Sequence, residues 1–249
     1  MKKSFFSLLR PASAILLWIA VWYIAAQAVN PHLLIRIPLP HRTLAVFLSD
    51  CGSSAFWRAV LISLLHILGG FGGGALFGSL IGVLSSRFAI FRSLAAPLLH
   101  LIRSVPVAAF IILAWLWIPN AVLPSFIAFL MVTPVLCQSV RNGYTAADEN
   151  LIEMAAVMGM RRQSIFFRIR LPLLAPFLRE GCITGLGFAW KSGIAAEVIC
   201  NPTGSIGSLL SAAKSSIDYE QVFAVTLTIV LLSFLLENLL KFLWKEQQR

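Results

Sequence analysis

Charged residues are scarce in this chain. Of its 249 residues only 12% are Asp, Glu, Lys or Arg, whereas 59% are hydrophobic. A soluble domain usually carries about 25% charged residues, so a water-soluble fold of this size could not cover its surface. Much of that surface must contact lipid, and we expect an integral membrane protein.

The residues of metal and redox chemistry are also sparse. The four cysteines and four histidines form no Cys-x-x-Cys pair and no His-Glu-x-x-His motif, so no zinc site or disulfide framework is indicated. Cys51 and Cys200 both fall on the predicted outer side; a disulfide between them stays open, although we favour free thiols. The acids and histidines form no constellation suited to acid–base catalysis, and we expect no catalytic residue, metal or cofactor in this chain.

A nucleotide-binding loop is missing as well. The sequence contains no GxxxxGK[ST] motif and no Gly-Lys dipeptide. Its glycine-rich run lies inside an uncharged apolar segment, where Gly70, Gly74, Gly78 and Gly82 recur every four residues. This spacing puts small residues on one face of a membrane helix and lets helix backbones approach closely. We therefore expect helix packing here, not phosphate binding.

Long uncharged apolar runs predict the fold class. A membrane helix needs about 20 apolar residues, and a run too long for one crossing is interrupted by Pro119, Asn120 and Pro124. The prediction is an all-α polytopic membrane protein, with a single transmembrane domain over residues 1–249 and the fifth span the least hydrophobic. Six spans are predicted, at about residues 12–29, 59–84, 96–117, 121–140, 177–199 and 222–243.

The basic residues predict the orientation. With the N-terminus inside, most Lys and Arg residues lie in cytoplasmic segments, and by the positive-inside rule both termini are expected in the cytoplasm. These cytoplasmic basic residues account for the net charge of +10, so no nucleic-acid partner is needed to explain it. The first apolar stretch is longer than the usual signal-peptide core, so we expect it not to be cleaved. The outer segments hold only Arg36, Arg42, Arg58 and Lys214.

Three charged residues fall at membrane depth: Arg103, Lys191 and Glu197. A charge at the bilayer centre costs about 2.5–3.5 kcal/mol on insertion scales, so all three are candidates for a transport pathway. For Lys191 we weigh pathway lining and structural pairing equally; if it faces the pathway, it favours an anionic or strongly polar solute. For Arg103 and Glu197 we favour structural pairing, with a backbone carbonyl or a neighbouring span.

The inner segment at residues 141–176 is the longest cytoplasmic loop and the most charged part of the chain. Asn150, followed three residues later by Glu153, has the spacing of a helix N-cap with a reciprocal acid. We predict a short helix over residues 151–158 that stops at Gly159, which tolerates a left-handed backbone.

A second short helix is predicted to begin at Gln163 and to end before Pro172. Two such helices at an angle, rimmed with arginine, would form a rigid knob on the cytoplasmic side. On charge alone, an ordinary solvated loop would be the simpler reading.

The spacing within this loop resembles the EAA loop of bacterial ABC importer permeases. In that pattern E-A-A is followed by three residues, a glycine, nine residues and I-x-L-P; here Met154 stands at the first alanine position. The residues that match this pattern are Glu153, Ala155, Gly159, Ile169, Leu171 and Pro172. The wider chain, about residues 61–243, is similar to the nitrate/sulfonate/taurine-type permease branch, and this similarity includes Arg103-Ser104-Val105-Pro106 and the stretch from Ala189-Trp190 to Ala196-Glu197.

The resemblance implies a coupling helix that docks on a separate cytoplasmic ABC ATPase, which binds ATP and Mg. Glu153 would contact the ATPase, Ala155 and Ala156 would permit close approach, and Gly159 would set the bend. Arg161 and Arg162 are expected to make polar contacts with the ATPase.

The resemblance also implies an external solute-binding protein, a homodimer of permeases, and a bacterial inner-membrane location. A secondary transporter or channel that works without an ATPase is the alternative. The sequence does not identify the solute.

Overall fold

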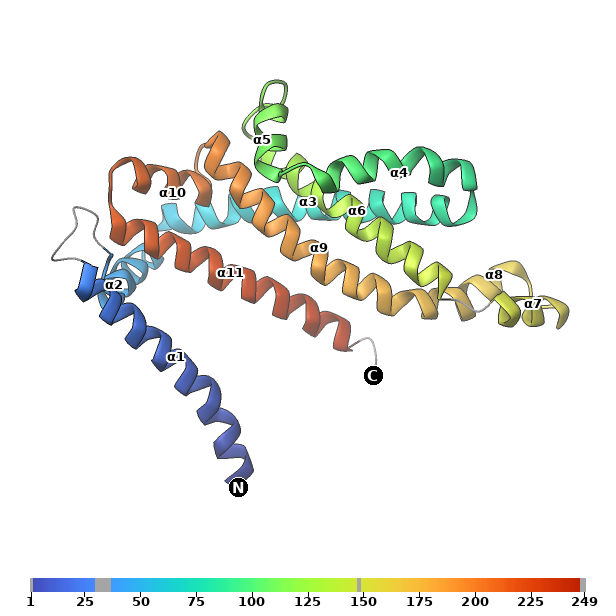
Figure 1. The fold of residues 1–249 in the computed structure, drawn as a ribbon, viewed down its shortest axis with the longest axis horizontal. Helices are drawn as coiled ribbons and strands as arrows, with labels where there is room; N and C mark the ends of the chain where they lie inside the picture. Colours follow the sequence, from blue (N-terminus) through green and yellow to red (C-terminus); the bar gives the residue numbers. More distant parts are fainter. Residues whose placement is uncertain (1, 30–36, 147–148, 247–249) are drawn as a thin grey trace.

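A computed structural model describes residues 2–29, 37–146 and 149–246 of the chain. Within these ranges every regular element is a helix, as expected for segments that must satisfy their own backbone hydrogen bonds in lipid (Figure 1). The helices are α1 (Lys2–Val29), α2 (Pro40–Cys51), α3 (Ser54–Arg87), α4 (Ala89–Ser104), α5 (Val107–Trp115), α6 (Leu123–Thr145), α7 (Glu149–Val157), α8 (Arg162–Ile165), the π-helical η1 (Phe166–Arg170), α9 (Leu171–Cys200), α10 (Ile206–Ser215) and α11 (Tyr219–Glu246).

Three of the described helices are long and apolar enough to cross a membrane: Ser54–Arg87, Leu123–Thr145 and Tyr219–Trp244. A fourth is added if α4 and α5 together count as one span. The described apolar stretch of α1, Leu16–Ala28, is shorter than a full span. The 30-residue α9 is long enough but does not meet the same test of apolar composition. Six spans therefore remain a prediction.

The predicted third span, residues 96–117, is not one continuous helix. α4 and α5 meet at a bend of 103°. The break lies at Val105 and Pro106, both of which have extended backbone angles. Proline disfavours the α conformation in the residue before it, and here that preference ends α4.

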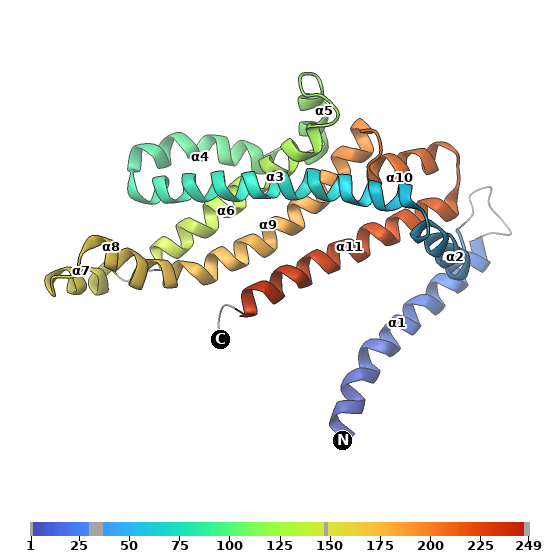
Figure 2. The ribbon, with the colours of Figure 1, turned by 180° about the vertical axis from the view of Figure 1, so that it is seen from behind.

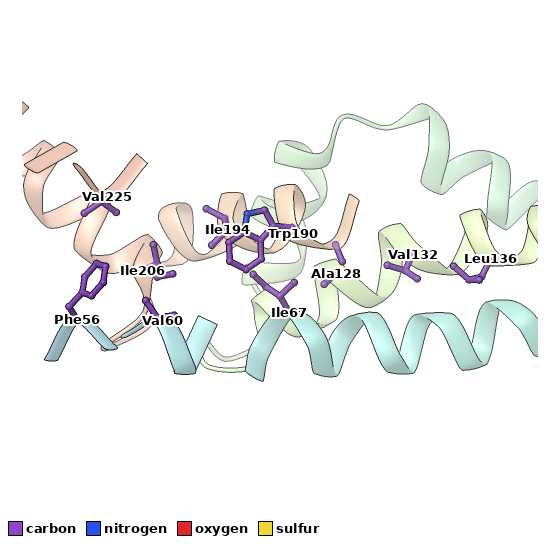
Figure 3. Packing of buried hydrophobic residues seen from close by; sticks show 11 residues of the cluster. Phe56, Val60, Ile67, Ala128, Val132, Leu136, Trp190, Ile194, Ile206 and Val225 are labelled. Atoms are coloured by element: carbon purple, nitrogen blue, oxygen red, sulfur yellow. The ribbon is translucent and has the colours of Figure 1, made fainter. Parts of the chain in front are cut away.

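α6 lies at the centre of the bundle. Of its apolar 18-residue stretch 61% is buried, against 28% for the corresponding stretch of α3 and 17% for that of α11. α3 packs along one side of α6 and α9 along another. Trp190 of α9 also donates a hydrogen bond from Nε1 to the Ile229 carbonyl of α11, at 3.1 Å. The main cluster of buried side chains runs between these helices (Figure 3).

The four glycines of the α3 stripe lie in the contact between α3 and α6. All four are buried, and a Cβ built on any of them would come within 3 Å of a backbone oxygen of α6. The oxygens belong to Ser125, Phe129, Thr133 and Cys137 in turn. The stripe therefore packs within the chain.

The two ends of the bundle differ in structure. α7 and α8 lie beyond the ends of α6 and α9, whereas α2 and α10, two short helices that the sequence analysis missed, lie at the opposite end (Figures 1 and 2). α1 projects away from the bundle in both views, and its Trp22 stacks on Phe223 of α11 with ring centroids 5.6 Å apart.

Candidate coupling helix and pathway surface

α7 ends in a Schellman motif built on Gly159. The amide of Gly159 donates to the Ala156 carbonyl at 3.0 Å, and the amide of Met160 donates to the Ala155 carbonyl at 3.1 Å. Gly159 has a φ of +78°, in the left-handed region that glycine occupies at no steric cost. No neighbouring atom lies within 4 Å of a Cβ built there. Backbone conformation, not crowding, is thus the reason for a glycine at this position.

The two faces of α7 differ in exposure. Ala155 is 6% exposed and faces the rest of the molecule, whereas Met154, Val157 and Met158 are 64%, 89% and 80% exposed. We call these last three residues the α7 apolar face. Together with Glu153 they line a shallow hollow of about 370 Å³.

The other residues of the predicted coupling site spread along the loop. Glu153, Ala156, Arg161 and Arg162 are exposed, as are Leu171 and Pro172 in the first turn of α9. α7 begins at Glu149, so Asn150 lies inside the helix and does not precede it as an N-cap.

The expected end of the second helix before Pro172 is wrong. α8, η1 and α9 follow one another without a gap, so the chain is helical from Arg162 to Cys200. Pro172 occupies the first turn of α9, and the wider π-helical turn of η1 precedes it. Proline is tolerated in this arrangement because a π turn already departs from the α-helical bonding pattern.

A second hollow, of about 450 Å³, lies between α4, α5, α6 and α9. Its lining includes the polar side chains of Arg103, Gln138 and Ser139. Arg103 donates from Nη2 to the Pro134 carbonyl at 2.7 Å, a backbone pairing of the kind favoured from sequence. We call this cavity the α4–α9 hollow.

Lys191 lies on the exposed side of α9. Thr184, Phe188 and Lys191 are spaced at helical intervals and are all exposed, and Phe188 also lines the α4–α9 hollow. Among the described residues, none forms a hydrogen bond or ion pair with the Lys191 ammonium group.

Glu197 occupies a very different environment. Its side chain is 0% exposed, and one carboxylate oxygen accepts hydrogen bonds from Ser63 Oγ at 2.6 Å and from the Gly207 amide at 3.2 Å. The other oxygen lies 3.0 Å from His66 Nδ1. Glu197 therefore joins α3, α9 and α10, and it neither contacts Arg103 nor reaches the α4–α9 hollow.

The partners of Glu197 were not predicted from the sequence. Ser63 and His66 come from α3 and Gly207 from α10, which is absent from the predicted elements. A Cβ on Gly207 would lie 2.3 Å from the Glu197 Cβ, so glycine permits the close approach of these helices. A buried carboxylate requires donors somewhere in the fold, but that requirement alone does not identify them.

The cysteines are free thiols in the structure, Cys51 partly buried and Cys200 buried. Across the part of the chain that the structure describes, no three His, Cys, Asp or Glu residues are close enough to hold a metal ion.

The fold and these sites define an all-α, multi-pass membrane protein with a helical knob at one end of its bundle. Residues 74–246 match the model of the family described as the binding-protein-dependent transport system inner membrane component. The chain belongs to this family. It is accordingly a permease subunit of an ABC importer in the inner membrane. Importers of this family work with ATPase and solute-binding partners. Family membership therefore excludes the alternative of a transporter without an ATPase.

Named relatives cover most of the chain. A probable ABC transporter permease of Brucella melitensis is 31% identical over 183 residues, 73% of this chain and 74% of the relative. The taurine transport system permease TauC of Escherichia coli is 26% identical over 88% of this chain and 81% of its own length. The nitrate import permease NrtB of a Synechocystis species is 24% identical over 94% of this chain and 87% of its own.

Proposed function

We propose that α7 is the coupling helix of this permease and that its apolar face docks on the cytoplasmic ATPase. The observation that carries the proposal is the exposure of Met154 and Val157 on α7, and of Met158 in the turn that follows, outside the membrane bundle. Apolar side chains grouped on a water-facing surface mark protein–protein contacts. Glu153 beside them, with Arg161 and Arg162 in the adjoining turn, would supply the polar rim of such an interface.

The helix from Arg162 to Cys200 supports this role mechanically. Ala155 of α7 and Ile165 of α8 are both buried, so α7 rests on the start of that helix instead of hanging from a flexible loop. A displacement imposed on α7 would reach the membrane part of α9 as a rigid-body movement. ATP binding and hydrolysis in the partner would in this way alternate the access of the pathway.

The exposed side of α9 is the proposed pathway surface. Lys191 at membrane depth and Arg103 in the α4–α9 hollow are unfavourable against lipid. A second copy of the chain, facing the first across this surface, would remove both from lipid and enclose a pathway between the subunits. We therefore propose a homodimer, with both termini and the coupling helices in the cytoplasm and the solute-binding protein at the α10 end.

The charges of this surface favour an anionic or strongly polar solute. Arg103 and Lys191 are both cationic, and no acidic residue of the described ranges lines the α4–α9 hollow. Among the relatives, the nitrate and bicarbonate permeases are named for the transport of anions, whereas a relative from Chloroflexus aurantiacus is a riboflavin permease. The class of solute proposed here rests on the two cationic residues.

Replacement of Val157 by Asp tests the coupling role. Val157 is 89% exposed, so the change should leave the fold of the chain intact but bury an unpaired charge in the docked complex. We expect the amount of ATPase subunit that co-purifies with the permease to fall at least about tenfold, equivalent to about 1.4 kcal/mol of lost affinity.

Ile217→Asp is the matched control, because Ile217 is 67% exposed but lies at the α10 end of the molecule. This variant should retain the ATPase. A second pair of variants separates backbone from side-chain effects: Gly159→Asn should couple better than Gly159→Val, since Asn tolerates a positive φ and Val does not. Undiminished ATPase binding by Val157→Asp would refute the proposal.

A further inference from the structure

A third hollow, of about 460 Å³, lies where the end of α3 meets the loop that carries α7 and α8. Arg87 is the last residue of α3, Arg162 the first of α8, and Arg170 the last of η1. All three line this hollow, and among the residues that the structure describes no aspartate or glutamate does. We call it the arginine hollow.

The three guanidinium groups have no compensating charge from the described part of the chain. In the described ranges none of them forms an ion pair. Arg170 lies over the ring of Tyr144 at 4.9 Å from its centroid, a cation–π contact that orients the guanidinium and leaves its N–H groups free. Three positive charges around one cavity repel each other, and an anion bound in the cavity would attract all three and offset that repulsion.

We propose that the arginine hollow binds a phosphate group. Guanidinium groups match phosphate oxygens in a two-pronged geometry, and the volume falls within the range of about 300–1,000 Å³ usual for small-ligand sites. Apolar lining residues such as Ile165 and Phe166 leave the arginines as the groups that would select the ligand.

The place of the hollow in the fold indicates where the phosphate comes from. Arg87 ends a membrane-spanning helix, and Arg170 immediately precedes α9, so the hollow lies at the level where a bilayer has its headgroups. Basic pockets between membrane helices on the cytoplasmic side bind anionic headgroups. A phospholipid headgroup and a soluble phosphate share the same chemistry, and the experiment below distinguishes them.

A bound phosphate would connect two parts of the molecule that the chain joins only indirectly. Arg87 belongs to the packed bundle, whereas Arg162 belongs to the loop next to α7. The anion would therefore brace the loop against the end of α3. This inference does not rest on the coupling role of α7, because binding is measured without ATPase or transport.

The test is a thermal unfolding titration of the purified full-length chain in detergent. The added probes are inorganic phosphate in one arm and mixed micelles with phosphatidylglycerol in the other, with phosphatidylcholine as the lipid of no net charge. We expect phosphate, phosphatidylglycerol or both to raise the unfolding temperature of the wild type. Arg87→Gln and Arg170→Gln should weaken the apparent affinity at least about tenfold, the loss expected for a charge-assisted hydrogen bond.

Arg168→Gln is the matched control, since Arg168 is exposed in the same π-helical turn but does not line the hollow; it should respond like the wild type. Arg87→Lys keeps the cation and should bind with intermediate affinity, which provides a second variant if Arg87→Gln does not fold. A response to phosphatidylglycerol alone would identify a lipid headgroup, and a response to inorganic phosphate a soluble ligand. No rise with either probe, or equal rises in Arg87→Gln and Arg170→Gln, would overturn the proposal.

Discussion

The environment of Glu197 explains how an acid is accommodated among membrane helices. Its carboxylate accepts hydrogen bonds from Ser63 and the amide of Gly207 and lies against His66. Ser63 Oγ in turn accepts from the amide of Ile206, at 2.9 Å. The first amides of α10 are thus satisfied by groups of α3 and α9, and the positive end of the α10 dipole faces the carboxylate.

Replacement of Glu197 by Ala should therefore destabilise the chain. The change leaves the buried donors of Ser63 and Gly207 without their acceptor, and each unsatisfied buried donor costs about 1–3 kcal/mol. Glu197→Gln should cost less, because its amide oxygen still accepts hydrogen bonds. Thermal unfolding in detergent measures both, with Glu180→Ala, an exposed acid on the same helix, as control. If Glu197→Ala unfolds at the same temperature as Glu180→Ala, the hydrogen-bonded cluster does not stabilise the fold.

At the scale of single helices, α3 shows how backbone contact replaces side-chain packing. Its glycine stripe brings α3 and α6 close enough that any Cβ on the stripe would clash with backbone oxygens. In lipid, where apolar burial drives little association, such close packing is a main source of helix affinity.

A pair of glycine substitutions tests this contact. Gly74→Ala places a Cβ 2.7 Å from the Phe129 carbonyl oxygen, whereas a Cβ at Gly72 has no atom within 4 Å. We expect Gly74→Ala to lower stability by about 1–3 kcal/mol through overpacking. Gly72→Ala should be neutral or slightly stabilising, because alanine is the better helix former. Equal unfolding temperatures for the two variants would contradict the role of the stripe.

The same scale shows what the sequence could and could not predict. Apolar runs predicted α3, α6 and α11 because lipid leaves a spanning segment few alternatives to the helix. The bend at Pro106 was not predictable, since Pro97, Pro134 and Pro176 lie inside continuous helices. The end of α7 at Gly159 was predictable, because a glycine that tolerates a left-handed backbone is a local signal in the sequence. The hydrogen-bond partners of Glu197 could not be predicted, because they depend on which helices pack against α9.

For the whole molecule, the proposed homodimer requires a surface that faces a second copy. α11 and α3 expose many large apolar side chains of the kind that lipid solvates, such as Leu76 at 77% and Leu235 at 62%. The exposed side of α9 instead combines Phe188 with Lys191 and adjoins the α4–α9 hollow. This mixed surface is the one expected between subunits.

Cysteine cross-linking in membranes tests the arrangement. With the four native cysteines replaced, Phe188→Cys should form a covalent dimer with a short bis-maleimide reagent, because in the proposed homodimer the α9 surfaces of the two copies face each other. Leu76→Cys on α3 should stay monomeric under the same conditions, as expected for a lipid-facing position. Electrophoresis without reducing agent separates the two products. Cross-linking of Leu76→Cys but not of Phe188→Cys would place the subunit contact elsewhere.

The π-helical turn at Phe166–Arg170 has a consequence for how force could travel through this protein. A π turn holds one residue more than an α turn, and one residue corresponds to about 100° of rotation around the helix axis. If the surplus residue shifted along the helix, the segment that it passed through would rotate by about 100° relative to the helix on either side, without unfolding. A partner that binds at the base of this helix could then transmit torsion along it as well as displacement.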